Sequence, residues 1–291
     1  MTNGIAFASR EYKLLLDPAK LPAGPLHKAA RALWRDRIAP HLGEAGIGEA
    51  TGEFETAKQR RIVFRDTADG MLDRHSLVLR DRRKANGKGE LTLKLRVADL
   101  MIAAAREIAA SGTSSELEED IAPLANMVPS ADGRPVAVLA DPPSIRSRFA
   151  RSADVELGED DHGPSDLTGV AALYQGFAQM VDTAGEQTLF AGPVIREEVS
   201  KGQEAQLAGG ARAAFTVSLW YLADDATAAA SPPLCAEISF KVELGGATMS
   251  LADATSAASL FLTLQRVLGT MLELRFLSKT ALALPVRAER P

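Results

Sequence analysis

The sequence contains very little cysteine, and this scarcity excludes two kinds of architecture. Cys235 is the single thiol among 291 residues, so the chain holds no internal disulfide and no cysteine-rich zinc site. Long apolar runs are also missing. No segment approaches the roughly eighteen consecutive apolar residues of a membrane span, and the N-terminus lacks the charged start and apolar stretch of an export signal. We therefore expect a cytoplasmic protein without membrane contact.

The sequence also lacks an excess of positive charge. Its formal net charge of -5 argues against a general nucleic-acid binder, so an anion site must be a local concentration of lysine and arginine. Hydrophobic residues make up 46% and charged residues 24%, which is typical of a globular protein. A closed barrel with insertions uses this length as one domain. We predict one domain over residues 1–291, with helical insertions around 97–135 and 154–190.

The segment 76–96 predicts two strands joined at the turn 86–89. Successive side chains of a strand point to opposite faces, so the leucines of both strands share one face. Arg80, Arg82 and Lys94 fall on the other face. Such a cationic face suits a ligand with several negative charges. The alternative is an ordinary solvent-facing hairpin that carries long basic side chains.

Three further segments alternate in the same way. The strand expected over 7–16 places Glu11 and Lys13 on one face, and the strand over 144–151 places Arg146 and Arg148 together. The cleanest alternation lies over 235–244, where the polar face consists of Glu237, Ser239, Lys241 and Glu243. A further strand is expected to open at 62–64, a short one at 136–139, and two more at 192–200 and 214–223.

Helical spacing of apolar residues predicts helices over 26–38, 99–110, 114–127, 167–181 and 250–274. For 114–127 the prediction depends on four acidic residues near its start, because a helix N-terminus favours negative charge. Leu264 and Leu268 are expected to be buried beneath the last of these helices.

Strands with one charged and one apolar face predict an α+β fold: a closed antiparallel β-barrel of about eight strands, with helices packed outside and a charged lumen. Carboxylates among many cations are typical of a divalent-metal site beside a polyphosphate site. The alternative is that these acids only neutralise the cations. The residues expected in the lumen are Glu11, Lys13, Arg80, Arg82, Lys94, Arg146, Arg148, Glu237, Lys241 and Glu243.

Four pieces of the sequence together resemble one known family. They are REYK at 10–13; FRDTADGML at 64–72 with LVLRDRR at 77–83 and LTLK at 91–94; EISFKVE at 237–243; and SK at 278–279. They are similar to the N-terminal ExExK strand, the central block, the late EIELEL strand and the C-terminal SK element of the CYTH superfamily. This superfamily of triphosphate tunnel enzymes includes class IV adenylate cyclases, thiamine triphosphatases and inorganic triphosphatases. The middle of the chain, about 97–207, is matched only through 144–151.

The resemblance implies a role for each matched residue. Mg²⁺ or Mn²⁺ would be held by Glu11, Glu237, Glu243 and one of Asp224 or Asp225, with Glu11 and Glu237 as the catalytic carboxylates. One ion would orient the phosphate chain and a second would activate the attacking water. The side chains that would hold the triphosphate are Lys13, Arg80, Arg82, Lys94, Arg146, Arg148 and Lys279.

The chain departs from the family pattern at the carboxylates. Ser9 and Ser239 replace acids, and Lys241 adds a cation where the family has another acid. These changes weaken metal binding more than anion binding. The leading hypothesis is a metal-dependent hydrolase of an inorganic or organic triphosphate, with adenylate cyclase activity ranked below it. The alternatives are a catalytically weakened tunnel that binds a polyanion without turnover, and an apolar-ligand barrel of the lipocalin type.

Overall fold

The structure is a computed structural model that describes residues 5–110, 113, 115–130, 135–183, 187–223, 232–274 and 279. Its nine long strands are β1 (Ser9–Leu16), β3 (Lys58–Thr67), β4 (Leu77–Lys84), β5 (Gly89–Val97), β7 (Glu116–Pro123), β10 (Ile145–Leu157), β13 (Ile195–Gln206), β14 (Arg212–Leu222) and β15 (Cys235–Glu243). The shorter strands are β2 (Glu49–Gly52), β6 (Ala109–Ala110), β8 (Ala125–Pro129), β9 (Pro135–Leu139), β11 (Tyr174–Gln175) and β12 (Leu189–Ala191).

The α-helices are α1 (Leu26–Leu33), α2 (Met71–Arg74), α3 (Leu100–Ala105), α4 (Leu167–Leu173) and α5 (Leu251–Val267). A π-helical turn, Trp34–Ile38, continues α1, so the helix predicted over 26–38 is confirmed. Short 3-10 turns are formed by Pro18–Lys20, Ala39–His41, Gly43–Ala45, Phe177–Gln179 and Gly269–Met271. No helix in the described part of the chain combines the length and the apolar character needed to cross a bilayer.

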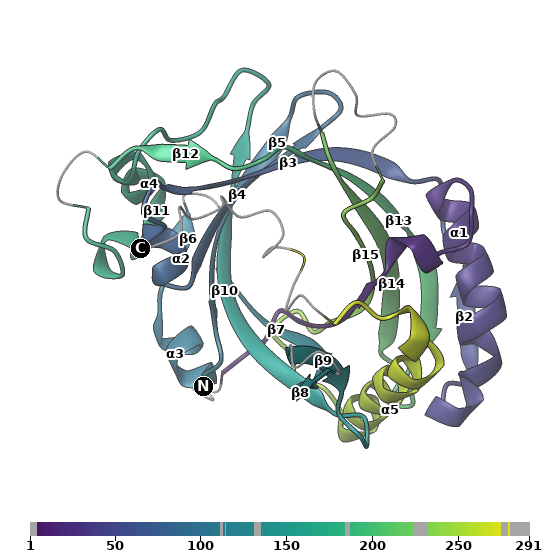
Figure 1. Ribbon diagram of the computed structural model, residues 1–291. Helices are drawn as coiled ribbons and strands as arrows, with labels where there is room; N and C mark the ends of the chain where they lie inside the picture. Colours follow the sequence, from purple (N-terminus) through teal and green to yellow (C-terminus); the bar gives the residue numbers. More distant parts are fainter. Residues whose placement is uncertain are drawn as a thin grey trace.

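The nine long strands of the described residues close into a barrel in the order β3-β4-β5-β10-β7-β1-β15-β14-β13, and β13 pairs back onto β3 (Figure 1). β1 runs parallel to β7, whereas the other neighbouring pairs of the barrel are antiparallel. The closed barrel is therefore confirmed. Its prediction as antiparallel with about eight strands is wrong, because the described barrel has nine strands and mixed direction.

One additional strand, β7, explains why both the number of strands and their direction differ from the prediction. The sequence predicts a helix over 114–127, but the described residues of this range form β7 and the start of β8. β7 fills the position between β10 and β1, and its direction makes the pair with β1 parallel. The helix prediction over 99–110 is only partly right, because α3 ends at Ala105 and the chain then enters β6. Similarly, α4 covers only the first half of 167–181.

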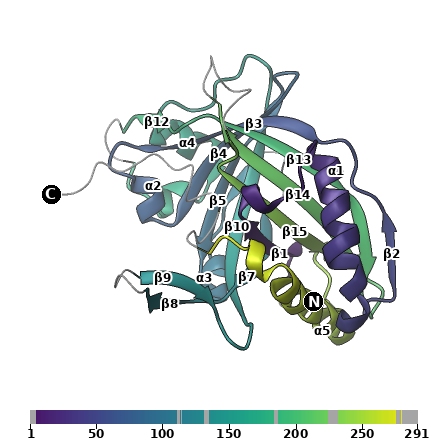
Figure 2. The ribbon, with the colours of Figure 1, turned by 45° about the vertical axis from the view of Figure 1, so that its right-hand side comes forward.

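Helices α1 and α5 pack on the outside of the barrel, beside β13 to β15 (Figures 1 and 2). Their apolar stripes meet the outward side chains of β1 and β15, and Tyr12 stacks on Phe240 with ring centroids 4.5 Å apart. Leu264 and Leu268 are buried in this core, as predicted. A second core lies outside the β4–β5 hairpin, where its leucines contact α2 and α4. Both of these cores use the outward faces of the strands. A third, smaller cluster of Ile62, Phe64, Ile195, Trp220 and Cys235 joins β3, β13, β14 and β15, and its Ile62, Phe64 and Trp220 line the lumen beside the polar side chains.

Candidate functional site

Four cationic side chains of the β4–β5 hairpin face the lumen, namely Arg80, Arg82, Lys94 and Arg96. Arg80 lies opposite Thr92 and Val78 opposite Lys94, so these four residues share one face. Leu79 and Leu93, which alternate with them, are fully buried in the outer core. Thr92 accepts a hydrogen bond of 3.0 Å from Arg80 Nη2 and donates one to Asp154 of β10. The strand alternation thus positions Arg80 and Lys94 on rigid backbone inside the barrel.

The lumen holds a cavity of about 220 Å³. Among the described residues its lining carries eight cationic and three acidic side chains, although the whole protein has a net charge of -5. The cations are Lys13, Arg60, Arg80, Arg82, Lys94, Arg96, Lys201 and Lys279, and the acids are Glu11, Glu197 and Glu237. The local concentration of positive charge that the sequence predicts is therefore present inside the barrel.

The structure divides the predicted site residues into two neighbouring cavities. Arg146 and Arg148 line a second cavity of about 140 Å³, whose walls also contain Leu15, Ile121 and Leu272. The two cavities share Lys13, Arg96 and Glu237. The arginines of β4, Arg80 and Arg82, and the arginines of β10, Arg146 and Arg148, therefore do not line the same cavity. Of the remaining predicted residues, Glu243 lies at the edge with its side chain 69% exposed, and Asp224 and Asp225 lie outside the described residues.

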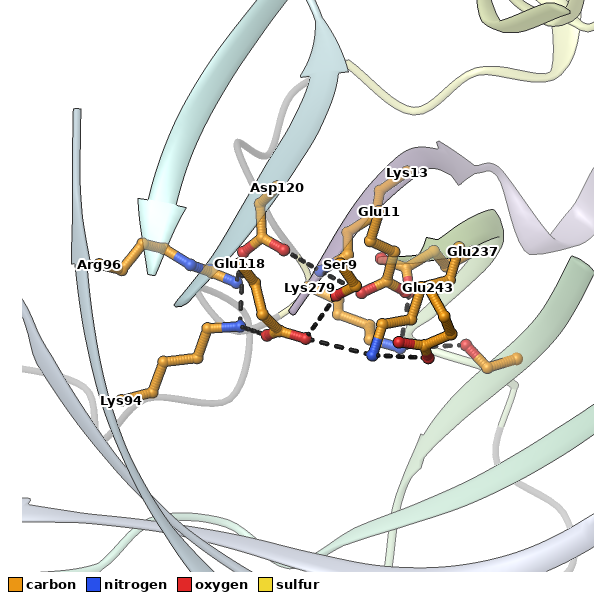
Figure 3. A network of polar contacts seen from close by, with 12 residues as sticks. Ser9, Glu11, Lys13, Lys94, Arg96, Glu118, Asp120, Glu237, Glu243 and Lys279 are labelled. Carbon is orange, nitrogen blue, oxygen red and sulfur yellow. Dashed lines mark hydrogen bonds and ion pairs between the residues drawn. The ribbon is translucent and has the colours of Figure 1, made fainter. Parts of the chain in front are cut away.

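Two acidic residues that the sequence reasoning missed, Glu118 and Asp120, stand at the centre of the lumen network (Figure 3). Glu118 contacts Lys94 at 3.0 Å and Lys241 at 3.2 Å, and it accepts a hydrogen bond of 3.0 Å from Ser9. These contacts join β7 to β5, β15 and β1. Residues Glu116, Glu118 and Asp120 alternate with Leu117 and Ile121, and this alternation was the sequence signal for a strand.

Asp120 lies two residues after Glu118 in β7, and its carboxylate contacts three cations. Its carboxylate is 2.6 Å from Lys13 Nζ, 2.8 Å from an Arg96 guanidinium nitrogen and 3.6 Å from Lys94 Nζ. Burial disfavours its charge, but these cations outweigh burial and hold the pKa of Asp120 well below its usual range. In the same way, burial is outweighed by Lys94 and Lys241, which lower the pKa of Glu118 to about 2. Both carboxylates are therefore ionised at neutral pH.

A second cluster joins Glu197 of β13 to Lys279. Trp220 Nε1 donates a hydrogen bond of 2.8 Å to the buried Glu197 carboxylate, and Lys279 Nζ lies 3.5 Å from it. Lys279 also contacts Glu237 at 2.8 Å. Burial disfavours the ammonium charge, but the two carboxylates outweigh it and raise the pKa of Lys279. The predicted C-terminal lysine therefore reaches the lumen, with its charge held by Glu237 and Glu197.

The opposite wall, formed by β3 and β4, has less compensating charge. The nearest carboxylate to Arg60 is Glu197 at 3.9 Å, and Arg80 lies 3.7 Å from Glu90, which forms its closer ion pair with Arg82. Burial, and then the charge of Arg82, lower the pKa of both Arg60 and Arg80. A lowered pKa of a guanidinium indicates positive charge that the surrounding protein does not fully stabilise. A bound anion would stabilise this positive charge.

Glu11, Glu237 and Glu243, the predicted metal ligands that lie within the described residues, each contact a lysine in this structure. In the described part of the chain, no three histidine, cysteine, aspartate or glutamate side chains come together as ligands. Glu11 contacts Lys13 at 2.9 Å, Glu237 contacts Lys279 at 2.8 Å and Glu243 contacts Lys241 at 3.1 Å. Hard cations such as Mg²⁺ need several oxygen ligands around one point. The described donor set therefore does not fit Mg²⁺ or Mn²⁺.

Comparison with known proteins gives structural matches alone. No family model and no curated protein matches the sequence. HpAC1 of Hippeastrum, assigned as an adenylyl cyclase and described as having a dominant triphosphatase activity, aligns at 14% identity over 94% of this chain and 93% of its own, with a TM-score of 0.46. A Bacillus halodurans protein assigned as an adenylate cyclase aligns at 13% identity over 94% and 96%, with a TM-score of 0.40. The Schizosaccharomyces pombe Mediator head module aligns at 9% identity over 90% and 96%, with a TM-score of 0.30.

These alignments are too distant to support an argument, so the class of protein rests on the barrel itself. The strands close into a barrel that encloses a cavity lined by charged side chains. This is the architecture that the resemblance of its motifs to the CYTH superfamily implies.

Proposed function

We propose that the tunnel binds a polyanion of the triphosphate class. The observation that carries the proposal is the excess of eight cations over three carboxylates among the described residues that line the larger of the two cavities. In a protein with a net charge of -5, such an excess inside a barrel is an electrostatic cost unless an anion shares the site. The charged lining also argues against an apolar ligand.

The phosphate groups would bind first at the wall formed by β3 and β4. Arg80 and Arg82 stand two residues apart on the inward face of β4, and Arg60 lines the same cavity from β3. Their guanidinium groups offer paired N–H donors that match phosphate oxygens. The side chains of Arg80 and Arg82 remain 30% and 26% exposed, so a ligand can reach them. Lys94 and Lys201 would supply further positive charge from neighbouring strands.

Isothermal titration calorimetry with inorganic tripolyphosphate tests this proposal. We expect saturable binding with a dissociation constant in the micromolar range, about 8 kcal/mol of binding free energy, that weakens as the salt concentration rises. Orthophosphate should bind more weakly, because it contacts fewer of the cations. An absence of tripolyphosphate binding at about millimolar ligand and low salt would overturn the proposal.

Metal-dependent hydrolysis of the bound triphosphate is the second candidate. It is favoured by the position of Glu11 and Glu237, which line the same cavity as the phosphate-binding cations. Phosphate release from tripolyphosphate in the presence of Mg²⁺ or Mn²⁺ tests it. Release that is abolished in Glu11→Gln and Glu237→Gln, with tripolyphosphate binding retained, would support a hydrolase. Binding without release by the parent protein would leave a binding module.

A further inference from the structure

Six carboxylates of the described residues, in the lumen or at its edge, each contact a lysine. Figure 3 shows five of them, Glu11, Glu118, Asp120, Glu237 and Glu243, and the sixth is Glu197. Lys13 bridges Glu11 at 2.9 Å and Asp120 at 2.6 Å. The second bridge is made by Lys241, which lies 3.2 Å from Glu118 and 3.1 Å from Glu243. Lys279 bridges Glu237 and Glu197. Each ammonium group therefore lies between two carboxylates, where a bound divalent cation would otherwise have to lie.

We propose that Lys13, Lys241 and Lys279 are built-in counter-cations, so that the tunnel binds its polyanion without a divalent metal ion. This inference rests on the proposed function, and it specifies the chemical form of the ligand: the metal-free polyanion rather than its magnesium complex. The protein supplies the positive charge that a metal would otherwise carry.

The geometry of the carboxylates explains why a metal is disfavoured. Mg²⁺ needs about six oxygen ligands at roughly 2.1 Å, whereas the lumen carboxylates already hold ammonium groups at hydrogen-bonding distance. A metal ion would have to displace a lysine and then lie next to its charge. Lys241 has the largest effect, because it occupies the inward face of β15 between Ser239 and Glu243 and neutralises Glu118, which reaches it from β7 over the intervening strand β1.

The first test compares tripolyphosphate binding in EDTA with binding in excess Mg²⁺. Because Mg²⁺ neutralises part of the charge of tripolyphosphate in solution, we expect affinity to be highest in EDTA and to fall about threefold or more in Mg²⁺. Binding that requires Mg²⁺ would overturn the inference and leave the proposed function intact. Absence of binding under both conditions would overturn the proposed function, and the inference with it.

The second test uses Mn²⁺ alone, without a phosphate ligand, and the variant Lys241→Glu. The parent should show no Mn²⁺ binding below about millimolar concentration, whereas the variant should bind at least about tenfold more tightly, because Glu118 and Glu243 lose their shared cation and gain a third carboxylate. Lys28→Glu, on the exposed face of α1, makes the same charge change outside the barrel and should behave as the parent. Tight Mn²⁺ binding by the parent would overturn the inference. The parent titrations decide it even if Lys241→Glu fails to fold by circular dichroism.

Discussion

At the residue scale, the face of the strand on which a charged side chain lies decides whether that side chain reaches the lumen. Arg60 and Arg61 are neighbours in β3 with the same side chain. Both arginines line a surface groove, but only Arg60 also lines the lumen cavity, whereas Arg61 is exposed on the outer face of the barrel. The strand alternation alone separates a residue that reaches the lumen from one that does not.

This pair gives a matched test of the proposed site. Arg60→Gln should weaken tripolyphosphate binding by about 1.5–3 kcal/mol, because it removes a charge-assisted contact from a partly desolvated lumen. Arg61→Gln removes the same charge from the chain and should leave the affinity within about twofold of the parent. Calorimetry at fixed salt measures both. Equal losses for the two variants would show that binding follows overall charge and not the lumen.

The buried carboxylate of Asp120 gives a prediction about stability. Asp120→Asn should lower the free energy of unfolding by about 3 kcal/mol at neutral pH, because Lys13, Lys94 and Arg96 would remain close together without their shared negative charge. Urea unfolding followed by circular dichroism measures the loss. Asp36→Asn, which breaks an exposed ion pair with Arg35, serves as the control and should leave the unfolding midpoint unchanged. A small effect of Asp120→Asn would mean that the three cations find other partners.

At the scale of elements, the sequence predicts strands well where each face is chemically uniform. β15 alternates apolar and polar residues without exception from Ala236 to Glu243, and both its position and its faces are as predicted. β7 is different, because Glu119 on its outward face is as acidic as Glu118 on its inward face. Glu119 forms an ion pair of 2.6 Å with Arg10 of β1, far away in the sequence. A run of acids is ambiguous until the partner strand is known, and so the lumen acids were missed.

Helix α5 and the turn between β13 and β14 are tied together by one buried carboxylate. Asp253 Oδ1 accepts hydrogen bonds of 2.9 Å from the Gly209 amide and 3.1 Å from the Ala211 amide. The Ser250 hydroxyl caps the helix by accepting from the Asp253 amide, and it donates a hydrogen bond of 2.6 Å to Asp253 Oδ2. The sequence predicts the helix but not this contact, because the turn lies about forty residues away along the chain.

Asp253→Ala should therefore lower the free energy of unfolding by about 2–3 kcal/mol, because two turn amides lose their acceptor in a buried position. Asp253→Asn keeps the Oδ1 acceptor and should cost less than half as much. Urea unfolding of both variants, with tripolyphosphate binding as a check on the lumen, measures the difference. Equal costs for alanine and asparagine would indicate that the two amide hydrogen bonds contribute little.

At the scale of the whole molecule, the barrel separates its charges into two walls. The wall of β3 and β4 carries arginines with little compensation. On β1, β7 and β15, by contrast, a lysine contacts each of Glu11, Glu118, Asp120, Glu237 and Glu243. The sequence predicts the cations of the first wall, because they lie within one local hairpin. It does not predict the balance of the second wall, because that balance depends on the parallel pairing of β1 with β7. The less compensated arginines and the carboxylates neutralised by lysines therefore lie on opposite sides of one lumen.

The ion pairs of the second wall, formed by β1, β7 and β15, also make the stability of the barrel depend on pH. Glu118 joins β7 to β5, β15 and β1, and its pKa of about 2 in the folded protein lies below its ordinary value of 4.5. A carboxyl whose pKa is depressed by folding contributes stability above its unfolded pKa, and this stability is lost as the pH falls towards the folded value. We expect the free energy of unfolding to be independent of Glu118 above about pH 5 and to fall between about pH 4.5 and 2, by about 3 kcal/mol from this group. Asp120 contributes in the same direction, because its pKa is also depressed.

Urea unfolding at a series of pH values tests this coupling. The parent should lose up to about 1.4 kcal/mol per pH unit for each proton taken up in the acid range. Glu118→Gln cannot take up that proton, so it should be less stable than the parent at pH 6 but should show a shallower slope below about pH 4.5, and the two curves should converge near pH 2. Parallel curves over the whole range would mean that Glu118 is not ionised against Lys94 and Lys241 in the folded protein. The strand β7 would then be held in the barrel by its backbone pairing and outward side chains alone.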